Sequence, residues 1–197
     1  MDHAARLTLM IGECLSEAGL TPRDLSAISI SAGPGSYTAL RIGTSVAKGM
    51  CYALGVPLIA VDTLGSLAAA AISELSLTDA IVVPMIDARR MEVYTTFYDT
   101  SGKAIVPLHS MIVCEATFDE YLAKGVQIVL TGNGAEKCRS VLPESPLLHY
   151  YPLACSARHM ISAARTKFAT QVFADLVGFT PEYCKQPNIT TPKKIFS

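Results

Sequence analysis

The sequence is poor in charged residues and has almost no net charge. Only 17% of its 197 residues are charged, and the net charge at pH 7 is −1. Without a basic surplus the chain has no global attraction for phosphate, which excludes an autonomous nucleic-acid binder of the basic-patch kind. Half of the residues are apolar, which excludes a disordered chain. A chain this apolar is expected to cover part of its surface with a partner.

The sequence also lacks the signatures of a membrane, secreted or metal-binding protein. Its longest apolar stretch, 46–61, is interrupted by Lys48, Pro57 and two glycines, whereas a membrane span needs about 20 consecutive apolar residues. The first six residues are not a signal-peptide start. The six cysteines form no CxxC pair, and the four histidines form no HxxxH pair. We therefore expect a cytoplasmic protein with reduced cysteines and with no membrane association, metal or cofactor.

The spacing of apolar residues predicts an α/β protein. In the first part, short strands at 25–31 and 58–61 alternate with helices at about 7–18, 39–54 and 63–74. The second part opens with three strands, at 80–86, 91–98 and 104–113. After them come a helix at about 117–125, a strand at 126–130, a helix at about 135–141, a strand at 147–150 and a long helix at about 156–176.

The second part therefore has the element order of a ribonuclease-H-like module, and the first part matches only the end of that order. Two strands are too few to cover three helices. We expect two such domains in tandem, the actin-like (ASKHA) architecture, with the first domain lacking its opening three strands. The expected boundaries are 1–76 for the incomplete first domain, 77–178 for the second and 179–197 for a C-terminal tail. One edge of the first sheet is then expected to be exposed.

A glycine-rich loop between the first predicted strand and the second predicted helix is a candidate anion site. Gly33 and Gly35 let the backbone approach a ligand, and Ser36 and Thr38 stand where unpaired helix N–H groups attract anions. The loop has no Gly-Lys-Ser/Thr, so it is not a Walker A loop, and a tight turn with Ser36 or Thr38 as N-cap is the favoured alternative. Arg41 opposes the helix dipole, and a carboxylate neighbour is expected for it more than a bound anion.

Two further features have a functional and a structural interpretation. The loop 131–134 (TGNG) repeats the glycine-rich geometry, but nothing beside it would hold Mg²⁺, so nucleotide binding is the minor alternative. Asp62 ends a strand, where a carboxylate could act as a general base. More often such an aspartate favours the N-terminus of the following helix.

Charged residues also crowd one predicted hairpin turn. They are Asp87, Arg89, Arg90 and Glu92. The favoured interpretation is a surface ion-pair network, worth less than about 1 kcal/mol per pair. Docking of a partner is the alternative.

The first two predicted helices carry complementary faces. The first presents a ridge of large residues, Leu7, Met10, Ile11 and Cys14. The second presents small residues spaced by four, Ala39, Gly43 and Ala47, followed by Met50. These faces either pack on the chain's own sheet or form a helical interface with another molecule, for which methionine is well suited.

Three segments resemble the signature of the TsaB (YeaZ) family. They are 31–43 (SAGPGSYTALRIG), 47–49 (AKG) and 61–64 (VDTL), and 86–94 (IDARRMEVY) resembles the family's second block. A weaker C-terminal similarity lies at 181–185 (PEYCK). The sequence departs from the family at Tyr37, Ala39, Cys184 and Lys185. Family members also open with strands that carry an Asp/Glu-Thr-Ser segment, which points again to a shortened first domain.

The resemblance implies an actin-like fold and a role in making threonylcarbamoyladenosine beside the tRNA anticodon. In that pathway TsaB is a non-catalytic partner of its paralogue TsaD, which holds the metal and transfers the group, and the ATPase TsaE joins them. The pairing uses the first two helices as half of a four-helix bundle, and TsaB alone forms a similar homodimer. We expect tRNA contact only through the complex. The rival functions are a small actin-like ATPase or kinase and, less favoured, a metallopeptidase.

Overall fold

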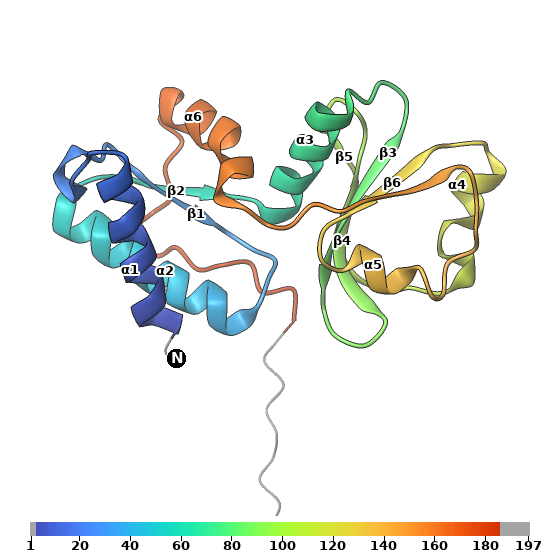
Figure 1. Cartoon of the computed structure of the whole chain (residues 1–197), viewed down its shortest axis with the longest axis horizontal. Coiled ribbons are helices and arrows are strands. Elements are labelled where there is room, and N and C mark those ends of the chain that lie inside the picture. Colours follow the sequence, from blue (N-terminus) through green and yellow to red (C-terminus); the bar gives the residue numbers. More distant parts are fainter. Residues whose placement is uncertain (1–2, 186–197) are drawn as a thin grey trace, which may run out of the picture.

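Two β-sheets organise the chain in the computed structural model, which describes residues 3–185 (Figure 1). The first sheet is a parallel pair, β1 (Ile28–Ser31) and β2 (Leu58–Val61). The second has five strands in the order β5-β4-β3-β6-β7. The helices α1 (His3–Glu17) and α2 (Tyr37–Leu54) lie with the first sheet, at the left of Figure 1. The predicted α/β class is confirmed.

The five-stranded sheet combines a meander with a parallel extension. The strands β3 (Ile81–Asp87), β4 (Glu92–Tyr98) and β5 (Ala104–Ile112) pair antiparallel through two short turns. The strands β6 (Ile128–Thr131) and β7 (Leu148–Tyr151) then add in parallel beside β3. β3 and β6 are central and buried on both faces, which explains their continuous apolar runs. The element order predicted for this part is observed.

The helix α2 shows how the first half assembles. The Ser36 side chain accepts the N–H of Ala39 and caps its start, and Gly55, with φ +69°, ends it. Its buried residues recur at helical spacing on one face: Leu40, Thr44, Ala47 and Cys51. That face packs on β1 and β2, in a core with Ile30 and Leu58.

Each half of the chain contributes one helix that packs on the sheet of the other half. α3 (Thr63–Leu75) follows β2 but buries Leu64, Leu67 and Ala68 against the five-stranded sheet. α6 (Ile161–Ala169) follows β7 but lies over β2, where Lys167 Nζ donates to the carbonyl oxygen of Ala60 at 2.7 Å. Figure 1 shows both helices in these exchanged positions. The two halves are therefore tied together by packing as well as by the chain.

The last predicted helix is wrong in length. A 3₁₀ turn (Ala157–Met160) leads into α6, which ends at Ala169 instead of continuing to residue 176. Gln171 takes a positive φ of 55° and turns the chain back. The N–H of Ala174 then donates to the carbonyl oxygen of Leu58 at 2.8 Å. The apolar spacing of residues 170–176 indicates a helix, but the unpaired edge of β2 bonds this segment in an extended form instead.

The shorter helices also differ in detail from the prediction. The segment predicted at about 117–125 is a 3₁₀ turn (Glu115–Phe118) followed by α4 (Asp119–Ala123). The helix after the TGNG loop, α5 (Ala135–Cys138), is a single turn. The predicted C-terminal tail is described only as far as Lys185, and its remainder, 186–197, lies outside the described residues.

Candidate functional site

The predicted anion loop is closed by the chain's own C-terminal segment. Gly33 has a φ of +105°, and a Cβ there would lie 2.5 Å from the carbonyl oxygen of Glu182. The N–H of Glu182 donates to the carbonyl oxygen of Ala32 at 2.7 Å. Ser36 acts as the helix cap, as the structural interpretation predicts. The glycine at 33 is therefore required for the close approach of residue 182, which takes the space in front of the loop.

Arg41 has an aromatic neighbour instead of the expected carboxylate. Its guanidinium lies 5.5 Å from the centre of the Tyr37 ring, and Nη1 donates to the Tyr37 hydroxyl at 3.4 Å. Tyr37 also packs against Tyr183, with ring centres 4.8 Å apart. No ion pair of Arg41 is found among residues 3–185. The expectation of a carboxylate was wrong because the ring face supplies the electrostatic partner.

The TGNG loop is pressed against the strand β3. A Cβ at Gly132, whose φ is +88°, would overlap the carbonyl oxygen of Met85. The N–H of Gly134 donates to that same oxygen at 2.9 Å, and Asn133 Oδ1 accepts the N–H of Asp87 at 3.0 Å. The N–H of Gly134 and the side-chain oxygen of Asn133 are thus engaged with β3. The loop serves to pack α5 against the sheet.

Asp62 is the N-cap of α3. Its Oδ2 accepts the N–H of Gly65 and, at 3.0 Å, the hydroxyl of Tyr98. Burial, and then the neighbouring carboxylate, raise the pKa of Tyr98 above its usual range. The capping interpretation of Asp62 holds, and Tyr98 extends it by linking α3 to β4.

The carboxylates of the hairpin pair with lysines from distant parts of the chain. Lys137 on α5 bonds to Asp87 and, at 2.7 Å, to the carbonyl oxygen of Glu92. Lys185 bonds to the Glu92 carboxylate, and this bond lowers the pKa of Glu92. Burial raises the pKa of Asp87, but the bond from Lys137 and its neighbours bring it below the usual value. An ion-pair network exists, but its cations are not the predicted arginines.

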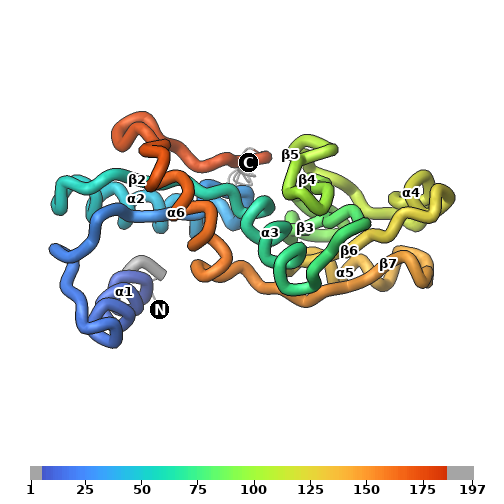
Figure 2. Tube along the Cα trace, turned by 90° about the horizontal axis from the view of Figure 1, so that it is seen from above, coloured from blue at the N-terminus to red at the C-terminus, as the bar shows by residue number. Residues whose placement is uncertain are grey.

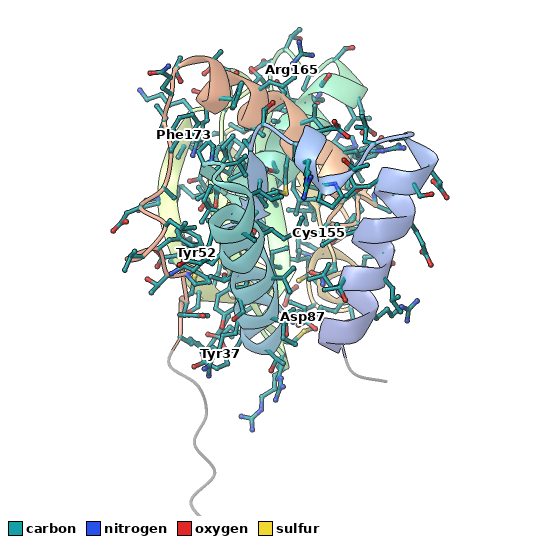
Figure 3. The ribbon with its side chains drawn as sticks, turned by 90° about the vertical axis from the view of Figure 1, so that its left-hand side faces the viewer. Tyr37, Tyr52, Asp87, Cys155, Arg165 and Phe173 are labelled. Atoms are coloured by element: carbon teal, nitrogen blue, oxygen red, sulfur yellow. The ribbon has the colours of Figure 1, made fainter. Side chains whose placement is uncertain are left out.

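The C-terminal segment 181–185 therefore connects the two halves. Glu182 bonds next to β1, Tyr183 packs on the first turn of α2, and Lys185 pairs with β4. Figure 3 places Tyr37 and Asp87 at the same end of the molecule. This segment has only a weak family similarity in the sequence, and no local pattern indicates that its residues reach both halves.

The predicted helical interface is partly exposed. On α1, Met10 is 55% exposed, and Leu9 beside it is 66% exposed. On α2, Tyr52 is 84% exposed and points outward in Figure 3. α1 packs beside α2, and in Figure 2 it lies on the side of the molecule opposite the C-terminal segment.

The small-residue face of α2 is divided between the surface and the core. Ala39 is exposed, and Gly43 and Met50 are half-buried. Ala47, at 5% exposure, faces the chain's own sheet, so its predicted place on the outer face was wrong. It lies on the same face as Leu40 and Cys51, and Cys51 shares a core with Ile30 of β1 and Leu58 of β2.

A small cavity of about 190 Å³ lies between the start of α3 and the segment before α6. Its polar lining comes from Ser31, Thr63, Ser66, Cys155, Ser156 and His159. His159 Nδ1 is buried without a hydrogen-bond partner among the described residues, and its Nε2 lies 4.0 Å from Glu74. The sequence carries no signal for this cavity because its residues come from three separated segments.

Neither a metal-ligand cluster nor a membrane helix is found within residues 3–185. No three His, Cys, Asp or Glu side chains there gather as ligands for a metal ion. No helix in the same range is both long and apolar enough to cross a membrane.

Comparison with known proteins identifies similar sequences and structures. Residues 1–194 match the family described as TsaD, tRNA N6-adenosine threonylcarbamoyltransferase. The tRNA threonylcarbamoyladenosine biosynthesis protein TsaB of Bacillus subtilis is 38% identical over 58% of this chain and 49% of its own. TsaB of Escherichia coli is 34% identical over 53% of this chain and 46% of its own length. The aligned region thus spans about half the length of these relatives.

The solved structures match over more of the chain. A crystal structure from Pseudomonas aeruginosa, of a protein described as similar to peptidase YEAZ, has a TM-score of 0.77 and 28% identity. It covers 93% of this chain and 85% of that one. A structure of YeaZ from the same organism has a TM-score of 0.74 and 27% identity, with 92% and 84% covered.

Proposed function

The chain belongs to the tRNA N6-adenosine threonylcarbamoyltransferase family, in its TsaB (YeaZ) group, and we propose that it is a non-catalytic partner of the TsaD transferase. In this role it helps to form threonylcarbamoyladenosine in tRNA. The observation that carries the proposal is the state of its two glycine-rich loops. Glu182 covers one and β3 covers the other. Both loops are packed against other parts of the chain and stabilise the fold.

The proposed partner surface is the outer side of α1 and α2. Leu7, Met10, Ile11 and Cys14 of α1 belong to it, together with Ala39, Gly43 and Met50 of α2. Leu9 and Tyr52, both largely exposed, extend it. Exposed apolar side chains on two adjacent helices are suited to packing against two helices of another molecule. We propose a heterodimer with a TsaD-like paralogue through this surface, and a homodimer through it when the chain is alone.

The remaining parts of the proposal concern architecture and setting. The repeated order β1-α2-β2-α3 and β6-α5-β7-α6, each with parallel strands, supports two actin-like halves divided near residue 76. A TsaE-like ATPase is proposed as a further partner, and tRNA is proposed to bind only to the assembly. The cytoplasm, where tRNA is modified, is the proposed location.

Reconstitution of the modification reaction tests this function. The chain, a TsaD-family partner, a TsaE-like ATPase, a supply of threonylcarbamoyl donor and an unmodified tRNA transcript are mixed, and the modified nucleoside is measured by mass spectrometry. We expect product only when both the chain and the TsaD-family partner are present. Product formed by the chain without that partner would refute the non-catalytic role. An undiminished yield without the chain would refute the partner role.

The rival ATPase or kinase function has its own test. Millimolar ATP with Mg²⁺ should neither shift the melting temperature of the isolated chain nor be hydrolysed by it. Turnover that survives purification would support the rival.

A further inference from the structure

The β3–β4 hairpin tip carries two arginines in a backbone conformation that suits neither. Arg89 has a φ of +71° and Arg90 a φ of +50°. Glycine and asparagine adopt positive φ values most readily, and the hydrogen bond that closes this turn runs from the Glu92 N–H to the Arg89 carbonyl oxygen. An Arg-Arg pair is held in this turn against its local preference. Such departures concentrate where a side chain serves a function other than folding.

Neither arginine forms an ion pair with the acids beside it, although the charge of Arg89 also helps to lower the pKa of Asp87. Asp87 is bonded to Lys137, and the Glu92 carboxylate is bonded to Lys185. Arg89 and Arg90 are exposed and form no ion pair within the described part of the chain. The acids are thus neutralised by lysines, and both guanidinium groups remain available to an external anion.

A third arginine lies at the same end of the molecule. The guanidinium of Arg41 packs on the ring of Tyr37, and the ring of Tyr183 packs against the same tyrosine. Two residues further on, Lys185 bonds to Glu92 at the base of the hairpin, so the start of α2 and the hairpin lie close together. Figures 1 and 3 show both at the lower end of the molecule.

We propose that the Arg89–Arg90 tip binds the phosphate backbone of RNA when the chain is part of its complex. This inference rests on the proposed function, and it names the part of this chain that contacts the nucleic acid. A guanidinium donates two parallel hydrogen bonds to one phosphate, and such contacts position an RNA without reading its sequence. A net charge of −1 gives the chain no other broad attraction for RNA. The tip therefore adds to binding by the assembly and does not replace it.

The test replaces the arginines with residues that tolerate their positive φ values. Arg89→Asn with Arg90→Gly places residues that tolerate positive φ at both positions and should leave thermal stability equal or higher. The assembled complex with a TsaD-family partner is titrated with a fluorescently labelled, unmodified tRNA transcript. We expect the affinity to fall about tenfold near 0.1 M salt, and the slope of log K against log salt to become shallower by about 1.5.

A matched control removes two other exposed arginines. Arg158 and Arg165 are exposed, and Figure 3 places Arg165 at the end opposite Asp87. Arg158→Ala with Arg165→Ala removes the same charge and should leave RNA affinity unchanged. Arg89→Lys with Arg90→Lys should bind RNA more tightly than the Asn-Gly variant but less tightly than the wild type. Lysine keeps the positive charge but cannot donate two parallel hydrogen bonds to one phosphate.

The outcomes separate this inference from the proposed function. Unchanged RNA affinity in a complex that still modifies tRNA overturns the inference alone. Loss of complex assembly overturns it too, because the arginines would then contact an acidic protein surface. An equal fall in the control variant would show a general charge effect and would also overturn it. If the wild-type chain forms no complex, both the proposed function and this inference fail.

Discussion

Replacement of Gly132 by alanine tests whether the TGNG loop is a packing element or an open binding loop. Gly132 is buried, has a φ of +88°, and has no room for a Cβ beside the carbonyl oxygen of Met85. An alanine would be strained in this conformation and would push the loop away from β3. The bond from the Gly134 N–H to Met85 would be lengthened by the same movement.

The size of the effect follows from two contributions. A left-handed conformation costs a non-glycine residue about 1–2 kcal/mol. Inserting a carbon where backbone already packs adds about 1–3 kcal/mol. We therefore expect Gly132→Ala to lower the free energy of unfolding by about 2–5 kcal/mol.

Gly102→Ala is the matched control. Gly102 also has a positive φ, +81°, but nothing lies within 4 Å of the position of its Cβ. It should lose only the conformational contribution, about 1–2 kcal/mol. Urea unfolding followed by circular dichroism measures both variants. Equal losses would refute the close packing of the loop on β3 and would reopen its interpretation as a phosphate-binding loop.

Two further predictions concern the contacts that join the halves. Because Lys185 lowers the pKa of Glu92 from its usual 4.5, their pair stabilises the fold above that pH and the stabilisation is lost as the pH falls through the lowered pKa. Lys185→Met should therefore reduce the free energy of unfolding at pH 7 more than at pH 3, and equal losses in urea at both pH values would contradict this. Tyr98→Phe removes the 3.0 Å hydrogen bond to Asp62 and should cost about 1 kcal/mol in the same assay, whereas an unchanged stability would show that this bond contributes nothing.

The regular parts of the fold could be predicted because their signals are local. A continuous apolar run indicated β3, β-branched and aromatic residues indicated β4, and residues spaced by four indicated α2. The glycine at 55 marked the end of α2 through its left-handed conformation. These features depend on residues within one or two turns of each other.

The errors arose where distant residues decide the outcome. The apolar spacing of Val172 and Leu176 suggested more helix, but the edge of β2 bonds Ala174 instead. Sequence proximity suggested that Arg89 and Arg90 pair with Asp87, yet Lys137 and Lys185 reach the acids of the hairpin. No local pattern shows which of two nearby cations will face a carboxylate once the sheet has formed.

The candidate site shows the same limit. The turn and cap interpretation of the loop at Gly33 followed from its sequence, but its closure by Glu182 required the folded chain. Helical spacing could not decide which small residues of α2 face outward. Ala47 belongs to the core because β1 and β2 lie beneath it.

The affinity of this chain for a TsaD-family partner tests the central claim most directly. Met10→Lys places a charge on the proposed surface, where the native side chain is 55% exposed, and Ile112→Lys makes the same change at a 74% exposed position on β5. By isothermal titration calorimetry, Met10→Lys should weaken binding more than about tenfold, which is about 1.4 kcal/mol, and Ile112→Lys should match the wild type. Equal binding by Met10→Lys and the wild type, or weakening by Ile112→Lys alone, would contradict a partner surface on α1 and α2.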